Sequence, residues 1–218
     1  MAKPIQFIVL EGIDGSGTTT QLGALAGRLR AAGKSVVTTG EPTAGPVGLL
    51  LRKILEGKLG PDEGATSFDW VALALLFAAD RAHHAQSSIL PSLERGQIVI
   101  CDRYDLSSRI YQSITAPNPD TALPWVSALN DRVPRPDLTF VLEVDPDLAE
   151  QRRSARGTEA ELFEKNSLQR RLARAYAEAV RYVPNDRLKH VQGDLPIGEV
   201  TDILVEVCLS SMREFASS

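Results

Sequence analysis

The feature that most constrains the fold lies near the start of the 218-residue chain, where an apolar segment, a glycine-rich loop and a helical pattern follow one another. Ile5 to Leu10 has the composition of a short buried strand, and Thr19 to Ala32 has helical spacing that ends at Gly33. The loop between them, Gly12-Ile13-Asp14-Gly15-Ser16-Gly17-Thr18-Thr19, has the spacing of the phosphate-binding pattern GxxxxGK followed by serine or threonine. We therefore predict a strand, a phosphate loop and a helix in this order.

One residue of this loop departs from the pattern, because Thr18 stands where the pattern has lysine. The glycines still allow backbone amides to approach phosphate oxygens, and the start of the following helix adds its positive end. A threonine hydroxyl carries no charge with which to neutralise phosphates during transfer. The residues predicted to bind a nucleotide are Gly12, Gly15, Ser16, Gly17, Thr18, Thr19 and Thr20. The alternative is a tight structural turn in which Thr19 caps the helix instead of binding magnesium.

Short apolar segments alternate with longer helical patterns along the rest of the chain. The further predicted strands are Ser35 to Thr39, Ile98 to Cys101, Leu138 to Val144 and Leu188 to Val191. Helices are predicted over Val47 to Leu55 and from about Phe68 to Glu94, whereas Thr115 to Thr121 is read as a surface loop. This order predicts one α/β domain over residues 1–218, a P-loop NTPase-type doubly wound parallel sheet of about five strands with helices on both faces.

Polar residues follow three of the predicted strands. The glycine loop follows the first strand, Glu41 the second, and Asp102 and Arg103 the third. Because ligands of such sheets bind outside the carboxyl ends of the strands, we expect these residues to meet at one site.

Two helical segments add arginines that are expected to face the same edge, Arg52 and Arg81. An arginine fork matches the geometry of phosphate, and Phe77, four residues before Arg81, would share its helix face. The alternative for each arginine is a solvated surface residue, and for Phe77 a place in the core.

The composition disfavours several kinds of partner. A formal charge of -4 offers no field that attracts nucleic acid, and no segment approaches the roughly 20 apolar residues of a membrane span. We expect a cytoplasmic protein without nucleic-acid or membrane partners. Cys101 and Cys208 lack metal-binding spacing and are read as reduced core residues, and Trp70 and Trp125 as core or interface residues.

Successive motifs along nearly the whole chain resemble those of bacterial thymidylate kinases. They are Glu41-Pro42 with Gly48 and Arg52, LFAADRAHH from Leu76, DRYDLSSRIYQ from Asp102, and PDLTFVLEVDP from Pro136. The segment from Asp102 to Gln112 is the most specific of them. The resemblance implies a homodimeric enzyme with a short lid at about residues 152–164, which transfers a phosphoryl group from MgATP to dTMP and gives ADP and dTDP.

The resemblance also implies roles for individual residues. Phe77 would stack on thymine, Ser108 and Gln112 would contact the base, and Tyr111 would lie beneath the sugar. Arg52, Arg81 and Arg103 would hold the phosphates, with Glu41 as a nearby acidic group. The implied catalytic residues are Asp14, Arg103, Arg153 and Arg156; the metal ligands are Thr19 and Asp102; and the loop around the donor adenine is Gly193 to Ile197.

Two departures from the family pattern remove positive charge from the donor half. One is Thr18, and the other is Leu162, which stands in Glu161-Leu162-Phe163-Glu164 where the lids of relatives have arginine. The loss of a charge-stabilising group costs roughly 2–4 kcal/mol at a transfer site. Arg152, Arg153 and Arg156 could compensate, or they could form a solvated helix face.

Three functions remain open at this stage. The first is a thymidylate kinase with a reduced rate, and the second is a catalytically weak or silent dTMP-binding paralogue with a regulatory role. The third, a kinase for another monophosphate, is disfavoured by Phe77, Ser108, Tyr111 and Gln112.

Overall fold

The computed structural model describes residues 5–59, 68–155, 163 and 166–216 of the chain. Its five strands form one parallel sheet in the order β2-β3-β1-β4-β5. The strands are β1 (Phe7–Gly12), β2 (Val36–Gly40), β3 (Ile98–Asp102), β4 (Leu138–Glu143) and β5 (Leu188–Gln192). The predicted fold class is confirmed, and each predicted strand is present within two residues of its expected ends.

The helices are α1 (Thr18–Ala31), α2 (Pro46–Leu55), α3 (Trp70–His84), α4 (Leu90–Glu94), α5 (Asp105–Thr115), α6 (Pro119–Asn130), α7 (Pro146–Ser154), α8 (Asn166–Ala177) and α9 (Ile197–Ala216). A π-helical turn, Ala85–Ile89, joins α3 to α4, so the long helical pattern predicted from Phe68 is continuous to Glu94. A short 3-10 helix, Ala179–Arg181, follows α8. None of the helices in the described ranges is long and apolar enough to cross a membrane.

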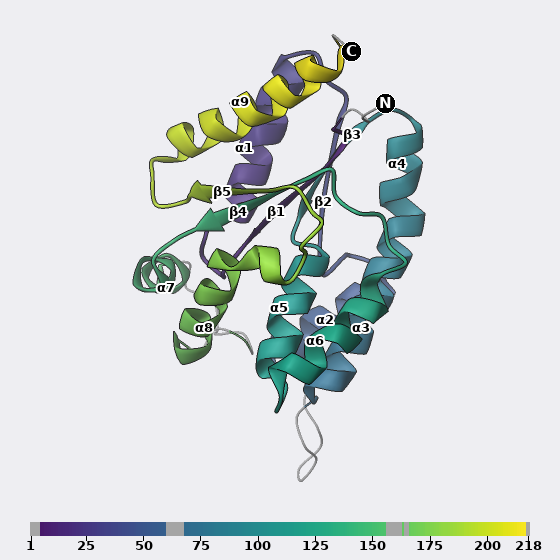
Figure 1. The fold of residues 1–218 in the computed structure, drawn as a ribbon, viewed down its shortest axis with the longest axis vertical. Helices are drawn as coiled ribbons and strands as arrows, with labels where there is room; N and C mark the ends of the chain where they lie inside the picture. Colours follow the sequence, from purple (N-terminus) through teal and green to yellow (C-terminus); the bar gives the residue numbers. More distant parts are fainter. Residues whose placement is uncertain (1–4, 60–67, 156–162, 164–165, 217–218) are drawn as a thin grey trace.

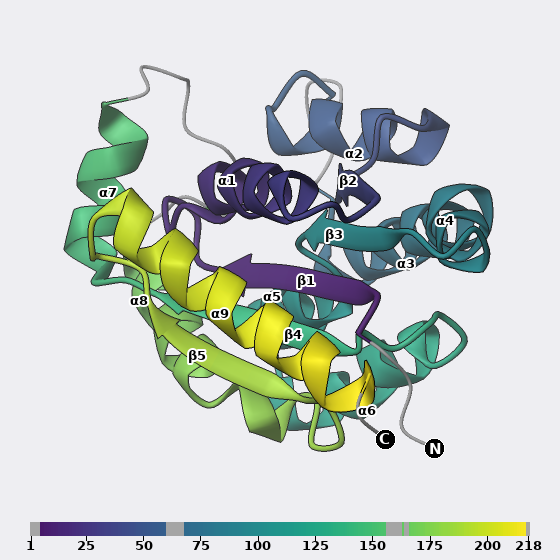
Figure 2. The same ribbon diagram turned by 90° about the horizontal axis from the view of Figure 1, so that it is seen from above.

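Alternating side chains of the sheet pack against two helical layers. Ile8 and Leu10 of β1 share a core with α1 and α9, which lie together on one face of the sheet (Figures 1 and 2). Phe7 and Val9 point to the other face, toward the π-helical turn and Leu93 of α4. This alternation follows from the two-residue period of a strand and explains why the strands read as continuous apolar runs.

The segment from Thr115 to Thr121 was predicted as a loop, and the structure corrects this. α5 extends through Thr115 and α6 begins at Pro119, so only residues 116–118 connect the two helices. The side chain of Asn118 accepts a hydrogen bond from the Thr121 amide, and proline occupies the first helical position. Asn-Pro is thus a helix start here, although the same dipeptide also marks turns.

Candidate active site

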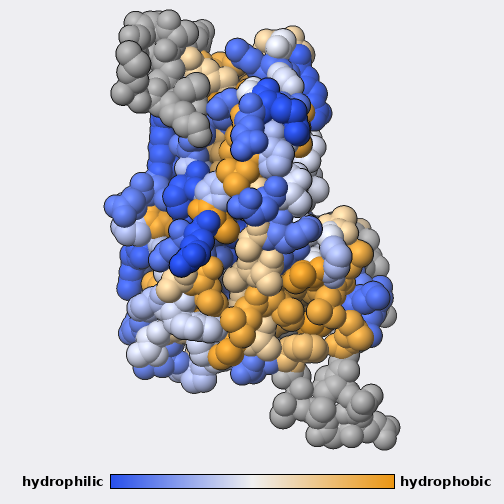
Figure 3. Space-filling view, turned by 90° about the vertical axis from the view of Figure 1, so that its right-hand side faces the viewer, coloured by the Kyte–Doolittle hydropathy of each residue, from blue (hydrophilic) through white to orange (hydrophobic). Residues whose placement is uncertain are grey.

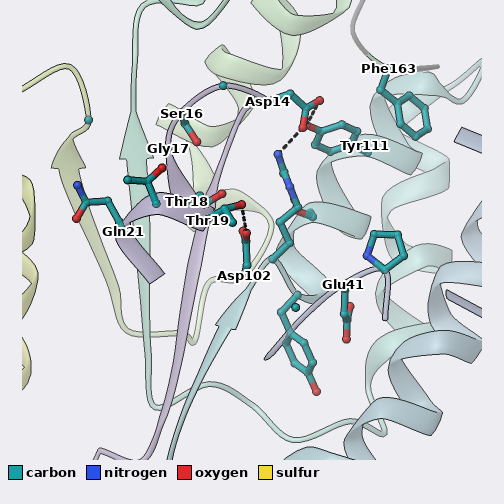
Figure 4. Close-up of a pocket in the computed structure, with 18 of the residues that line it drawn as sticks. Asp14, Ser16, Gly17, Thr18, Thr19, Gln21, Glu41, Asp102, Tyr111 and Phe163 are labelled. Carbon is teal, nitrogen blue, oxygen red and sulfur yellow. Dashed lines mark hydrogen bonds and ion pairs between the residues drawn. The ribbon is translucent and has the colours of Figure 1, made fainter. Parts of the chain in front are cut away.

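A cavity of about 730 Å³ opens at the carboxyl ends of the strands, as expected for this sheet topology. It is lined by residues of the phosphate loop, by Glu41 and Pro42 after β2, by residues 102–104 after β3, and by side chains of α3 and α5. Figure 4 shows the loop and Asp102 on one side of this cavity and Glu41 and Tyr111 on the other. The sequence analysis therefore predicted correctly that these segments meet.

The glycines of the phosphate loop hold conformations that other residues rarely adopt. Gly15 has a φ of 91°, and a Cβ atom there would lie 2.4 Å from the backbone oxygen of Ala149. Gly17, with a φ of 95°, occupies the N-cap position of α1, and no side chain caps this helix. The first amides of α1 therefore keep their donors for an anion, and Thr18, Thr19 and Thr20 line the cavity beside them.

Thr19 and Asp102 form a pair suited to a magnesium ion. The Thr19 hydroxyl donates to Asp102 Oδ2 at 2.5 Å (Figure 4), whereas Asp102 Oδ1 is buried without a partner. A hydroxyl and a carboxylate oxygen are the hard ligands that Mg²⁺ takes alongside phosphate oxygens and water. The residues present fit the ion that the loop pattern predicts.

Arg103 and Asp14 connect the two sides of the cavity. Arg103 donates to Asp14 Oδ1 at 2.5 Å, while Tyr111 and Gln169 donate to Asp14 Oδ2 at 3.2 and 2.8 Å. The backbone of Arg103 is left-handed, with a φ of 64°, which is strained for a residue other than glycine. Burial opposes the charge of Arg103, but the neighbouring Tyr111 and Asp14 outweigh it and raise its pKa, so this guanidinium stays a cation.

Arg81 lies at the cavity in a different state from the one expected. It is 1% exposed and donates to Glu41 at 2.9 Å, to Asn130 at 2.5 Å and to Ser108 at 3.0 Å. Protein acceptors therefore occupy its guanidinium in this structure, and a contact of Arg81 with a phosphate stays a prediction. His84 completes this network, because its Nδ1 lies 3.0 Å from the second oxygen of Glu41.

The predicted base-contacting side chains lie together on α3 and α5. Phe77, Ser108, Tyr111 and Gln112 all line the cavity. Gln112 is buried, and its Oε1 has no protein partner, so it is an acceptor available to a ligand. Arg52 is exposed at the cavity wall, and its guanidinium donates to the backbone oxygen of Pro42.

The far end of the cavity is formed by residues from α7 and from the loop after β5. Arg152 lines the cavity and donates to the backbone oxygen of Gly193 at 3.0 Å, beside Leu195 and Ile197. Arg153 instead is buried against the phosphate loop, where it donates to the backbone oxygen of Asp14, and it does not line the cavity. Arg156 and Leu162 lie outside the described residues, and so does most of the predicted lid.

Three residues of the site were not predicted, namely Glu11, Gln169 and Tyr176. Glu11 carries a sequence signal, since it is the charged residue in the otherwise apolar strand FIVLEG. Gln169 and Tyr176 carry none, because both belong to α8, more than 150 residues from Asp14 and Glu11, to which they donate.

The chain is similar to known proteins over most of its length. A family model described as thymidylate kinase matches residues 10–203. The chain is similar to a probable thymidylate kinase of Pyrococcus horikoshii, with 41% identity over 84% of this chain and 86% of the relative. It is similar to the putative enzyme of Treponema pallidum at 33% over 96% and 95%, and to the thymidylate kinase of Syntrophotalea carbinolica at 38% over 89% and 90%.

Proposed function

The chain belongs to the thymidylate kinase family and is a nucleoside monophosphate kinase that phosphorylates dTMP with ATP, and we propose how its residues divide this work. The proposal rests above all on one observation. A single cavity holds both a buried, unpartnered base acceptor, Gln112 Oε1, and an unpartnered carboxylate oxygen beside the phosphate loop, Asp102 Oδ1. Arg103 lies between these two ends.

At the acceptor end, the base of dTMP lies against Phe77, and Gln112 Oε1 accepts the N3–H of thymine. This assignment is supported by the burial of Gln112 and by its lack of a protein donor. Arg81 and Glu41 act together to fix Ser108 beneath the base. The sugar lies near Tyr111 and Asp14, and the monophosphate reaches Arg52 and Arg103.

At the donor end, the amides of residues 15–19 hold the β- and γ-phosphates of ATP. Thr19 and Asp102 would hold a magnesium ion, which would supply positive charge to offset the charge of the phosphates. The adenine lies against Arg152 and the loop from Gly193 to Ile197, which line the same end of the cavity and are joined by a hydrogen bond.

The transfer step needs positioning more than proton chemistry. An oxygen of the dTMP phosphate attacks the γ-phosphorus of ATP, and the bond from that phosphorus to the ADP oxygen breaks. Arg103 contacts the phosphates in transit, and Asp14 holds its fork in place. Thr18 offers a hydroxyl without charge, so we expect a lower rate than in a lysine-bearing relative.

Arg152 and Arg153 occupy different places in the described part of the chain. Arg152 lines the cavity at the adenine end, whereas Arg153 contacts the phosphate loop from behind, so we expect either arginine to compensate for the missing cations only in part. The catalytic roles of Arg153 and Arg156, and a lid at residues 152–164, stay predictions.

We further propose that the protein is a homodimer. Figure 3, which views the molecule from the side of α3 and α4, shows hydrophobic side chains gathered over its lower part. The exposed Leu49 and Leu75 belong to α2 and α3, and Trp70 packs edge-to-face on Trp125 with 5.4 Å between the rings. Such an apolar face suits a subunit interface. A cytoplasmic location and the absence of nucleic-acid partners stay predictions.

The test is an ADP-release assay with dTMP and MgATP, run beside a thermal-shift measurement with dTMP alone. We expect turnover that is lost when magnesium is chelated and a higher melting temperature with dTMP. Stabilisation by dTMP without dTDP formation at high enzyme concentration would instead indicate a silent nucleotide-binding protein.

A further inference from the structure

Behind the phosphate loop lies a carboxyl group that the reaction described above does not use. Glu11, near the end of β1, is 0% exposed and does not line the cavity. Burial raises its pKa to about 7, against the effects of the Arg103 charge and of hydrogen bonds from Ser107 and Tyr104. A carboxyl buried in an apolar strand is costly unless donors surround it, so its partners are informative.

Four donors from two helices converge on Glu11. The amides of Tyr104 and Ser107 donate to Oε1 at 2.8 and 3.2 Å. The hydroxyls of Ser107 and Tyr176 donate to Oε2 at 2.6 and 3.0 Å. Because no side chain of α5 caps its own first turn, Glu11 performs this capping from the neighbouring strand.

Arg103 directly precedes Tyr104, the N-cap residue of the turn that Glu11 caps. A left-handed residue other than glycine costs about 1–2 kcal/mol and persists where its surroundings fix it. Arg103 Nη1 donates to the same two hydroxyls, Ser107 Oγ and Tyr176 OH, at 3.2 Å each. Ser107 Oγ and Tyr176 OH also lie 2.8 Å apart, and either of them can donate to the other. Hydrogen bonds therefore lead from Arg103 through the two linked hydroxyls to Glu11.

We propose that Glu11 is a positioning residue that, through Ser107 and Tyr176, orients the Arg103 guanidinium toward the phosphate in transfer. The inference rests on the proposed function, in which Arg103 contacts that phosphate. Glu11 accepts from this hydroxyl pair, so the hydroxyl protons are directed away from Arg103 and oxygen lone pairs face its N–H groups. Asp14 holds the other end of the fork, so the guanidinium is fixed from two sides.

Glu11→Gln separates positioning from simple capping. The amide oxygen of glutamine can still accept from the Tyr104 and Ser107 amides, so the cap survives. Its NH2 group, however, would meet hydroxyls that already accept from Arg103, and one hydrogen bond of the chain must reverse or break. A residue that only caps the helix would tolerate this change, whereas a positioning residue would not.

The experiment is a double-mutant cycle of Glu11→Gln with Arg103→Ala, read as kcat for dTMP with MgATP at a pH well above the Glu11 pKa of about 7, where the wild type carries the carboxylate. We expect kcat to fall by up to about 100-fold in the single variant, as for a small misplacement of a reacting group. In the Arg103→Ala background the same change should alter kcat by no more than about twofold, because the guanidinium through which Glu11 acts is absent.

A matched control removes another buried carboxylate from the same turn. Asp105→Asn weakens the ion pairs with Arg109 and Arg135, and Asp105 does not line the cavity. We expect it to lower the melting temperature and leave kcat within about twofold. If Glu11→Gln does not fold, Tyr176→Phe removes one of the two linking hydroxyls and serves in the same cycle.

The outcomes separate the two claims. An inactive wild-type protein contradicts the proposed function. The cycle is then measured with the dissociation constant of dTMP in place of kcat. An effect of Glu11→Gln on this constant that depends on Arg103 supports the inference. With an active wild type, the inference fails if Glu11→Gln leaves kcat unchanged, if its full effect persists without Arg103, or if Asp105→Asn lowers kcat equally.

Discussion

The acceptor end and the donor end of the cavity are built in different ways. At the acceptor end, buried side chains hold one another, as Arg81 does with Glu41, Asn130 and Ser108. At the donor end, the ligands for phosphate are backbone amides of a glycine loop whose shape depends on its own dihedral angles. A change of side chain therefore disturbs a hydrogen-bond network at the acceptor end. At the donor end it leaves the backbone amides in place, which explains how the loop accommodates Thr18.

Arg103 belongs to both ends, so its removal should have the largest effect. We expect Arg103→Ala to lower kcat by roughly 100- to 1000-fold, on the scale of other preorganised charge donors. Single-turnover measurement of dTDP formation checks this. Arg103→Lys serves as the control, since it keeps the charge but loses the fork. A loss below tenfold would assign the transferring phosphate to another cation.

The buried carboxyl of Glu11, which stabilises the turn before α5 behind both ends of the cavity, predicts a dependence of stability on pH. The folded-state pKa of Glu11, about 7, lies above its ordinary value of 4.5, so the folded protein retains a proton that the unfolded chain releases. The free energy of unfolding should therefore fall as the pH rises from about 4.5 to about 7, by up to about 3 kcal/mol. Urea unfolding across this range should show the fall in the wild type and not in Glu11→Gln. Equal slopes in both proteins would contradict the prediction.

Thr18→Lys restores the missing charge at the donor end. We expect kcat to rise about 10- to 100-fold, because a cation then lies beside the phosphates in transfer. The dissociation constant of dTMP should stay unchanged, since the acceptor end is separate. Thr18→Val, which adds neither charge nor hydroxyl, is the control. An unchanged rate in the lysine variant would mean that another cation already fills this role.

Gln112→Leu tests the acceptor end alone. The substitution leaves the N3–H of thymine without an acceptor, which costs about 1–3 kcal/mol in a buried site. We expect kcat/KM for dTMP to fall about tenfold or more, with the KM for ATP unchanged. Ser113→Ala, on the same helix and bonded only to backbone oxygens of α5, is the control. A comparable fall in that variant would point to a general loosening of α5.

Arg152→Ala should have the smallest effect of the set. Arg152 is half-buried and contacts the donor end through one backbone oxygen, so we expect the KM for ATP to rise about three- to tenfold, in line with a cation–π contact of about 1 kcal/mol. The KM for dTMP should not change. Arg28→Ala, which removes an exposed ion pair with Asp202, should change neither constant. A rise in the KM for dTMP would show that Arg152 also affects the acceptor end, which contradicts the separation of the two ends.

The fold was predictable because its signals are local. Each strand is an apolar run of a few residues, and the phosphate loop joins a strand to a helix within eight positions. The start of α6 was missed because Asn118-Pro119 marks both turns and helix starts, and the choice depends on whether Asn118 caps an amide.

The site was predictable as a set of residues but not as a network. Sequence motifs identified Arg81, yet its burial depends on Glu41 and Asn130, which lie 40 and 49 residues away in the chain. The contacts of α8 with Asp14 and Glu11 have no local pattern at all. Arg152 and Arg153 are adjacent, and only the packing of α7 against the loop decides which of them reaches the cavity.

The Trp70–Trp125 pair has a spectroscopic consequence. The chain has two tryptophans, both are in this pair on α3 and α6, and neither lines the cavity. Ultraviolet emission from indole therefore reports on one face of the molecule, and a second subunit that covers this face would shift the emission to shorter wavelength. Nucleotides in the cavity contact tyrosines instead, so subunit association and ligand binding can be followed as separate optical signals in one unlabelled sample.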